Sequence, residues 1–408
     1  ANGNYSKAII YLKEVLIKDP QSAKARYLLG SAYLKTEQLR FVEKELSLAY
    51  QLEPDNIKYR LHYARSLLFK EKYTETLNLI SFVSPDPVLE GERLNLLAII
   101  FYVKKQYKEA EKYFHQAINK GCVKANIGLA NIALSKKELK KAGLYIDQFL
   151  NAEPDNRTAW KLKARIFNLS HQYQQAINIY SRLLNYDTND YELYLQRAAS
   201  LLALNKLAEA EADINVILKK NNNLPIANSL LARLRFQEKK YKEAEKYSQR
   251  ILKYNSKHKP SLFITASSSF ALNNYNLAEK RFLELLIMEP DNVDIYIMLA
   301  NIYLVQQNAD SALLILETLS ENIRNNNVQL LTLLTHAYLA AGQYNKAMDH
   351  LHRAQSIAPE NKAIEQLIDI SRIQAGEMGT TKSLFLFNES YKKSRQADYL
   401  LLALYFQE

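Results

Sequence analysis

Apolar residues recur at spacings of three and four along most of the chain, in short blocks that polar turns separate. The block AKARYLLGSAYLK (23–35) has this pattern, and LRFVEKELSLAYQL (39–52) repeats it after a short turn. Such spacing places the apolar side chains on one face of an α-helix. Two blocks in close succession therefore predict a helix–turn–helix hairpin.

Three columns of residues indicate that this hairpin recurs about every 34 residues. The first column holds small residues: Gly30, Ala64, Ala98, Ala130, Ala164, Ala198, Ala232, Ala266, Ala300 and Ala403. A second small column follows later in each repeat: Ala8, Ala110, Ala142, Ala176, Ala210, Ala244, Ala278, Ala312 and Ala347. An aromatic column precedes it: Tyr5, Tyr73, Tyr107, Tyr173, Tyr241, Tyr275 and Tyr344. We expect small residues where two helices approach closely, and each Tyr near the start of a second helix.

The string EPDN occurs at 53–56, 153–156 and 289–292, and the related APEN occurs at 358–361. Proline cannot continue a helix interior, because it lacks an N–H group and clashes with the preceding turn. Asp and Asn side chains accept hydrogen bonds from the free N–H groups at the start of a helix. The string therefore predicts a joint between hairpins, where Pro ends one helix and Asp and Asn begin the next.

These columns resemble the tetratricopeptide repeat (TPR) family in repeat length, in the small residues at repeat positions 8 and 20, and in the Pro at position 32. Trp160 also occupies the family's position 4. The resemblance implies an all-α fold, a right-handed α-solenoid superhelix of about eleven hairpins. On this register, 1–22 is the second half of a truncated repeat and 23–361 holds ten repeats. A degenerate repeat follows at 362–395, and 396–408 is the first helix of a truncated further repeat, so we expect a fragment of a longer protein.

Composition narrows the function classes. The 408 residues include 54 Lys and Arg against 43 Asp and Glu, a net charge of +11, which allows an acidic partner without requiring nucleic acid. The single cysteine, Cys122, excludes a disulfide within the chain. No apolar run is long enough for a transmembrane helix, and the start ANGNYSKAII does not have the profile of a signal peptide.

The sequence contains no pattern typical of a catalytic or cofactor site. The seven histidines are scattered and are interpreted as solvated surface residues, and no HExxH, GxGxxG, GxxxxGK[ST] or GxSxG is present. Cys122 lies in the turn position that Pro occupies in other repeats, and no His accompanies it as a nucleophile would require. We therefore predict a protein that is not an enzyme and that needs no cofactor or metal.

The TPR resemblance implies that positions 2, 5, 9, 12 and 13 of each first helix line a concave groove. Position 9 contributes Arg65, Asn131, Arg165, Arg233, Asn301 and His336. Positions 2 and 5 contribute Lys24, Tyr27, Lys58, Lys124, Lys161 and Phe263, and position 12 contributes Tyr102, Phe236 and Phe270. The opposing acids at position 2 are Glu92, Glu192 and Asp294.

Basic residues outnumber acidic residues in this set, so the predicted groove is mildly cationic with aromatic patches. It suits an extended, acidic peptide or protein segment, or a polysaccharide stacked on the aromatic rings. The alternative is that the polar side chains are merely solvated and the rings only pack repeats together. We expect no nucleic acid, because aromatic residues are not interleaved with Arg as in RNA-binding surfaces.

A narrower resemblance is to bacterial PEP-CTERM-system TPR-repeat lipoproteins (PrsT-like). It rests on VLIKDPQSAKARYLLGSAYLK (15–35), AIEQLIDISRIQAGEMGTTKSL (363–384) and ADYLLLALYF (397–406). The resemblance implies a scaffold in a bacterial envelope system for exopolysaccharide export or surface-protein sorting. It implies a periplasmic or outer-membrane-attached protein, touching the membrane only through a lipid anchor before residue 1. The alternatives are a cytoplasmic TPR adaptor that binds an extended acidic peptide, and the TPR part of a larger enzyme.

Overall fold

The computed structural model describes residues 4–36, 38–221 and 224–374, and all regular secondary structure in these residues is helical. The predicted all-α class is confirmed. The predictions for the second half of the degenerate repeat and for the final helix lie outside the described residues. The first helices of the successive hairpins are α2 (Ala23–Lys35), α4 (Ile57–Leu68), α6 (Pro87–Val103), α8 (Ala125–Ser135), α10 (Arg157–Leu169), α12 (Tyr191–Ala203), α14 (Pro225–Gln237), α16 (Lys259–Ala271), α18 (Val293–Val305), α21 (Val328–Ala340) and α23 (Lys362–Gln374).

The second helices alternate with them. They are α1 (Tyr5–Lys18), α3 (Leu39–Leu52), α5 (Tyr73–Leu79), α7 (Tyr107–Asn119), α9 (Leu139–Ala152), α11 (Tyr173–Leu184), α13 (Leu207–Lys220), α15 (Tyr241–Tyr254), α17 (Tyr275–Met288), α19 (Ala309–Glu317) and α22 (Tyr344–Ile357), and the short α20 (Glu321–Asn325) follows α19. Each tyrosine of the aromatic column is the first residue of its helix, which confirms the predicted position of that column.

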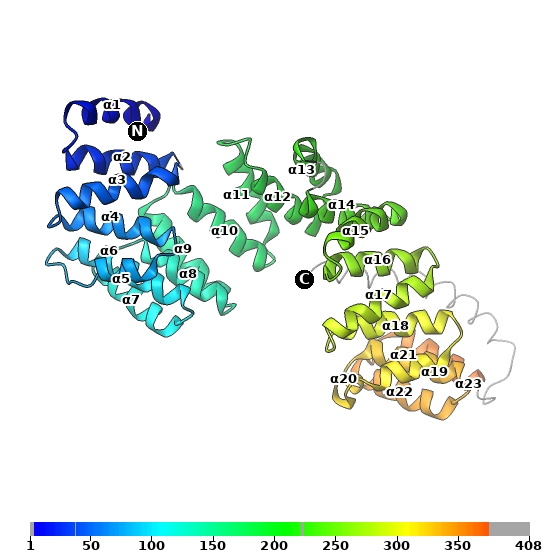
Figure 1. The fold of residues 1–408 in the computed structure, drawn as a ribbon. Helices are drawn as coiled ribbons and strands as arrows, with labels where there is room; N and C mark the ends of the chain where they lie inside the picture. The colour runs from blue at the N-terminus through cyan, green and yellow to red at the C-terminus, as the bar shows by residue number, and fades with distance from the viewer. Residues whose placement is uncertain (1–3, 37, 222–223, 375–408) are drawn as a thin grey trace. The chain divides into compact units, whose positions relative to one another are not determined.

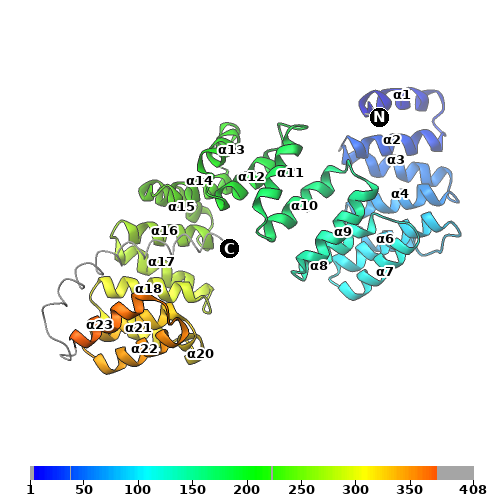
Figure 2. The same cartoon turned by 180° about the vertical axis from the view of Figure 1, so that it is seen from behind.

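The chain divides into two compact units, Ala1–Ile179 and Tyr180–Glu408, with the boundary inside α11. Within each unit, helices that follow each other in the chain pack side by side, as α2 and α3 or α14 and α15 do (Figure 1). First helices also contact first helices: α4 with α6 and α6 with α8, then α12 with α14 and α14 with α16. The reverse view shows the same order of neighbours (Figure 2). Each unit therefore carries a wall of first helices.

The small columns lie where the helices approach most closely, as predicted. Ala98 and Ala130 of the first column and Ala110 and Ala142 of the second are fully buried. At Gly30 an added Cβ would lie 2.8 Å from Cγ of Leu46, so a larger residue there would push its neighbour away. Close packing of this kind leaves no room for side-chain growth without displacement of the neighbouring helix.

In nine of the hairpins, the turn between the two helices uses one residue with a left-handed backbone. After α6, Lys105 has a φ of 60°, and its N–H group donates to the carbonyl of Tyr102 at 2.9 Å. The N–H of Gln106 donates back to the carbonyl of Phe101 at 2.9 Å, which completes a Schellman-type helix end. The same conformation recurs at the equivalent position of the other turns: Glu71, Lys137, His171, Asn205, Lys239, Asn273, Gln307 and Gly342.

The EPDN joints cap the following helix through Asn alone. The side chain of Asn156 accepts from the N–H of Ala159 at 3.1 Å and donates to Glu153 at 3.1 Å, and Asn56 and Asn292 form corresponding bonds. The expectation that the Asp residue of the string also caps is wrong within the described chain. The side chains of Asp55, Asp155 and Asp291 are exposed and accept no helix N–H group there.

One joint departs from the regular pattern. α5 ends at Leu79, and α6 begins at Pro87, ahead of the repeat start near 91 that the register predicts. The buried carboxylate of Glu90 accepts from the N–H of Ser84 at 2.8 Å and from Arg93 at 2.6 and 2.8 Å. The hydrogen bonds from Arg93 hold the pKa of Glu90 below its usual value, although burial acts in the opposite direction. These hydrogen bonds hold the non-helical segment between α5 and α6 in place.

Candidate partner-binding groove

The wall of first helices in the first unit brings several predicted groove residues together. Tyr27 of α2 stacks on Tyr59 of α4, with ring centroids 4.7 Å apart and planes inclined by 25°. The ring of His62 meets Tyr27 edge-on at 5.0 Å, and its Nε2 lies 3.4 Å from the Tyr27 hydroxyl. Lys58 places its Nζ 5.4 Å from the Tyr27 centroid, a cation–π contact. The two helices thus share an aromatic patch with a cation above it.

An ion pair continues this surface from α4 to α6. Nη2 of Arg65 lies 3.5 Å from Oε2 of Glu92, and both side chains are about one-fifth exposed, at 22%. The pair neutralises one predicted groove cation with one of the predicted acids. Lys58 and Lys124 are exposed and form no ion pair with the described residues. The surface therefore retains two unneutralised cations, one on α4 and one directly before α8.

His62 stays neutral in this setting. Burial lowers its pKa from 6.5 to about 4, and the positive charges of Arg65, Lys58 and Lys124 add to the effect, while Glu92 opposes it. The interpretation of the histidines as solvated surface residues is wrong for His62, which lies half-buried against Tyr27. A neutral imidazole offers both a hydrogen-bond donor and an acceptor to a neighbour.

The neighbouring thiol is a core group. Cys122 is 7% exposed and belongs to a hydrophobic cluster with Phe114 and Leu129. Burial raises the pKa of the thiol, and the charge of Glu92 adds to this. A buried thiol with a raised pKa is a weak nucleophile.

Four other predicted groove residues of the first unit lie outside this patch. Lys24 and Arg165 are exposed, and Asn131 and Lys161 are half-buried. The described contacts tie none of Lys24, Asn131 and Arg165 to the patch formed by Tyr27 and its neighbours. They remain candidate groove residues on the strength of the repeat register alone.

The aromatic residues at repeat position 12 do not stand free in a groove. Each packs against the tyrosine that begins its own second helix, with centroids 5.5 to 5.8 Å apart, in the pairs Tyr102–Tyr107, Phe236–Tyr241 and Phe270–Tyr275. Phe236 is only 6% exposed. Each of these rings joins the two helices of its own hairpin. The burial of Phe236 corrects its assignment as a partner-binding ring, whereas Tyr102 and Phe270 are half-buried and stay candidate groove residues.

Phe263 is also corrected. Its side chain is 1% exposed and meets Phe282 edge-on at 5.7 Å inside the core of the second unit. A ring so buried offers no face to a partner. In the same unit Arg233, Asn301 and His336 are half-buried, and burial lowers the pKa of His336, so it too differs from a solvated histidine.

Sequence reasoning missed Tyr59 and His62 as members of the patch. The spacing of Lys58, His62 and Arg65 contained the signal, since residues four and three apart lie on one helix face. The stack of Tyr27 on Tyr59 had no such signal, because it joins two different helices. The described residues contain no group of three His, Cys, Asp or Glu side chains that could hold a metal ion. Nor does any helix among them have the length and apolar character to cross a membrane.

Comparisons with known proteins agree with the repeat architecture. A tetratricopeptide repeat model matches residues 104–166, 169–234 and 269–335, and a second tetratricopeptide repeat model matches residues 1–39. Together the matched segments make up more than half of the chain. A Haemophilus influenzae protein named for cytochrome c-type biogenesis, CcmH, is 36% identical over 98 residues. That match covers 23% of this chain and 21% of the relative, so the chain spans only a small part of the relative's length.

Several solved helical-repeat structures are similar to the chain. A tetratricopeptide repeat protein from Parabacteroides merdae ATCC 43184 is 22% identical and has a TM-score of 0.46, covering 61% of this chain and 98% of its own. The Cut9–Hcn1 hetero-tetramer of the APC/C is 12% identical with a TM-score of 0.45, covering 90% and 93%. The TPR domain of P58(IPK) is 14% identical with a TM-score of 0.38, covering 92% and 94%.

Proposed function

Because the chain belongs to the tetratricopeptide repeat family, whose repeats bind protein partners, we propose that it is a non-catalytic scaffold whose first unit binds an extended acidic peptide. The observation that carries the proposal is the exposed Lys58 above the ring of Tyr27, with a second exposed cation, Lys124, directly before α8. Two cations without a carboxylate partner attract an acidic segment, and the half-buried ring of Tyr27 gives its apolar side chains a contact.

The neutral His62 and the existing ion pair define what else such a peptide meets. Glu92 is held by Arg65, so it does not cancel the charge of Lys58 or Lys124. The half-buried imidazole of His62 supplies a polar group at the edge of the rings. A peptide that alternates carboxylates with apolar or polar uncharged side chains fits this arrangement best.

Fluorescence anisotropy with a labelled, Glu-rich peptide tests the proposal. Reversing two charges with Lys58→Glu and Lys124→Glu is expected to weaken binding by about thirtyfold at low salt, because like charges now face the peptide. The control makes the same charge change elsewhere in the unit, with Lys44→Glu and Lys140→Glu on exposed faces of α3 and α9. Equal weakening by both pairs would mean that net charge alone drives binding, and would refute the groove.

If the partner is a polysaccharide, we expect a different result. A neutral oligosaccharide that stacks on the rings would lose affinity in Tyr27→Ala and keep it after both lysine reversals. That outcome, together with no binding of the acidic peptide, would indicate that the ligand is a sugar chain and not a peptide.

We place this scaffold in a bacterial envelope system for exopolysaccharide export or surface-protein sorting, in the periplasm or attached to the outer membrane. Support comes from the resemblance of 15–35 and 363–384 to PEP-CTERM-system lipoproteins. The similarity to a protein named for cytochrome c-type biogenesis is in keeping with a role in assembly. Fractionation of cells that express the full-length protein tests the location. Recovery in the cytosol would refute the envelope setting and favour a cytoplasmic adaptor.

A further inference from the structure

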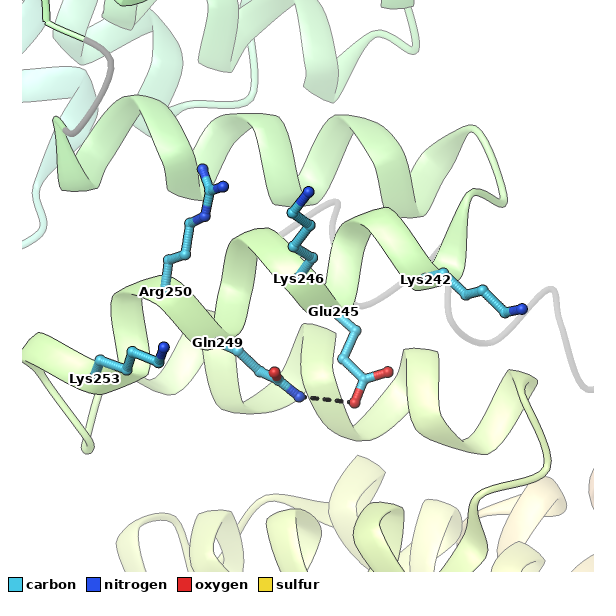
Figure 3. A pocket seen from close by; sticks show the side chains of 6 residues that line it. All are labelled: Lys242, Glu245, Lys246, Gln249, Arg250 and Lys253. Atoms are coloured by element: carbon cyan, nitrogen blue, oxygen red, sulfur yellow. Dashed lines mark hydrogen bonds between the residues drawn. The ribbon is translucent and has the colours of Figure 1, made fainter.

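We propose that the exposed face of α15 in the second unit binds an acidic helical segment of a partner protein, at a surface separate from the first-unit groove. Six residues of this one helix line a shallow hollow of about 510 Å³ (Figure 3). They are named the α15 face below: Lys242, Glu245, Lys246, Gln249, Arg250 and Lys253.

The α15 face carries an unneutralised positive charge. None of its four cations pairs with a carboxylate in the described chain, although Arg250 lies over the ring of Tyr247 at 5.3 Å. Its only acid, Glu245, accepts a hydrogen bond from Nε2 of Gln249 at 2.9 Å. Figure 3 shows Glu245 and Gln249 pointing to one side of the helix, away from Lys246 and Arg250. The carboxylate of Glu245 therefore does not lie against Lys246 or Arg250.

A second helix of the same chain shows that the fold does not require these cations. The heptapeptide YKEAEKY begins both α7, at 107–113, and α15, at 241–247. After it, the face positions of α7 hold His115, Gln116 and Asn119, where α15 holds Gln249, Arg250 and Lys253. Both helices occupy the same place in their repeats and pack through the same small column. Arg250 and Lys253 are thus additions to the solvent side of α15.

A second hollow adds an apolar contact to this charge. Arg250 and Lys253 also line a neighbouring hollow of about 290 Å³ with Pro225 and Tyr254. Tyr254 is 81% exposed at the end of α15. An exposed ring beside unpaired cations offers a partner both a hydrophobic anchor and electrostatic attraction.

The spacing and shape of the surface favour an acidic helix. The cations follow each other at intervals of four, four and three residues, so they lie about 6, 6 and 4.5 Å apart along the helix axis. Carboxylates at positions i and i+4 of a second helix have the same rise, and the two rows match when the helices lie side by side. A flat membrane surface does not fill a hollow. Single-stranded nucleic acid favours successive rings between the cations, whereas the exposed ring beside these cations is that of Tyr254, at one end of the row.

Titration of the 408-residue chain with a fluorescein-labelled helical peptide, bearing Glu at positions i, i+4 and i+8, tests the proposal. The variant Arg250→Gln, Lys253→Asn gives α15 the residues of α7 and is expected to weaken binding about tenfold at roughly 0.05 M salt. Both positions are exposed, so circular dichroism should show an unchanged fold. The matched control, Lys108→Gln with Lys112→Gln, removes two charges from the shared heptapeptide on α7 and should leave the affinity unchanged.

Three further results test whether the helical peptide binds to the α15 face. The first-unit variant Lys58→Glu, Lys124→Glu should leave binding of this helical peptide intact, and loss of binding there would overturn the assignment to α15. Equal weakening by the α7 control would overturn it as well, since binding would then follow net charge. Binding of a poly-dT strand or of phosphatidylserine vesicles that depends on Arg250 and Lys253, without binding of the peptide, would replace the acidic helix by that ligand.

Discussion

Adding one methyl group at Gly128 of α8 is expected to destabilise the first unit, whereas the same addition at Gly143 of α9 is expected to stabilise it. A Cβ at Gly128 would overlap Cζ and Cε1 of the Phe114 ring. Around an ideal Cβ at Gly143, no atom lies within 4 Å. The two glycines lie in the two helices of one hairpin, so the comparison isolates the contact with Phe114.

The magnitude follows from two opposing effects. Replacing Gly by Ala inside a helix gains about 1 kcal/mol in both variants. Phe114 is 1% exposed and is packed against Leu129, so its ring cannot leave without disturbing the core. Overpacking costs about 1–3 kcal/mol, and the overlap places Gly128→Ala near the upper end. The net change is a loss of about 2 kcal/mol at Gly128 and a gain of about 1 kcal/mol at Gly143.

Urea unfolding of the 408-residue chain, followed by circular dichroism, measures both changes. Hydrogen exchange in peptides from α7 and α8 assigns the effect to the contact between these two helices, because a chain of two units need not unfold in one step. The double variant Gly128→Ala, Phe114→Leu should be more stable than the sum of the single effects, since the smaller side chain relieves the contact. Equal stability of the two Ala variants would refute the packing argument, as would strict additivity in the double variant.

Two further predictions concern the joint and the groove. Asn156→Ala should lower the free energy of unfolding by about 1–2 kcal/mol because α10 loses its cap, whereas Asp155→Ala should change it little; equal effects in thermal unfolding would contradict the assignment of the cap to Asn. Acidification from pH 6.5 to about 4 should lower the free energy of unfolding by roughly 3 kcal/mol or less through His62. The pKa of His62 is lower in the folded than in the unfolded chain, so the unfolded chain binds the proton first. This stability is fully present above pH 6.5, and His62→Gln should remove that part of the pH dependence in urea titrations at each pH, while an unchanged slope would exclude His62 as its source.

The repeat could be predicted from the sequence because its requirements are local and recur. Ala98 and Ala110 are small since two helices meet there, and the same demand returns in every hairpin, which makes the columns visible without a structure. The joint containing Asn156 is visible for the same reason. The early start of α6 was not visible, because it depends on the buried pairing of Glu90 with Arg93, a single event in the chain.

The side chains of the groove could be predicted only in part. The position of a residue in the repeat predicts that it lies in the wall of first helices, but it does not predict which side chains lie next to it. Lys58 is exposed beside Tyr27, whereas Phe263 at the same repeat position as Tyr27 is buried against Phe282. The exposure of these side chains depends on contacts between different helices, and a column of single residues in the sequence does not show such contacts.

The two proposed surfaces arise where the chain departs from its own repeat. The helices α7 and α15 begin with the same seven residues, and the repeat requires the same packing of both. They differ on the solvent side, where Arg250 and Lys253 add charge that packing does not need. By the same reasoning, the stack of Tyr27 on Tyr59 belongs to one pair of helices and not to the column. Because the repeated positions serve packing in every hairpin, we expect a partner to recognise solvent-exposed positions at which one hairpin differs from the others, and these positions are the natural targets for mutation.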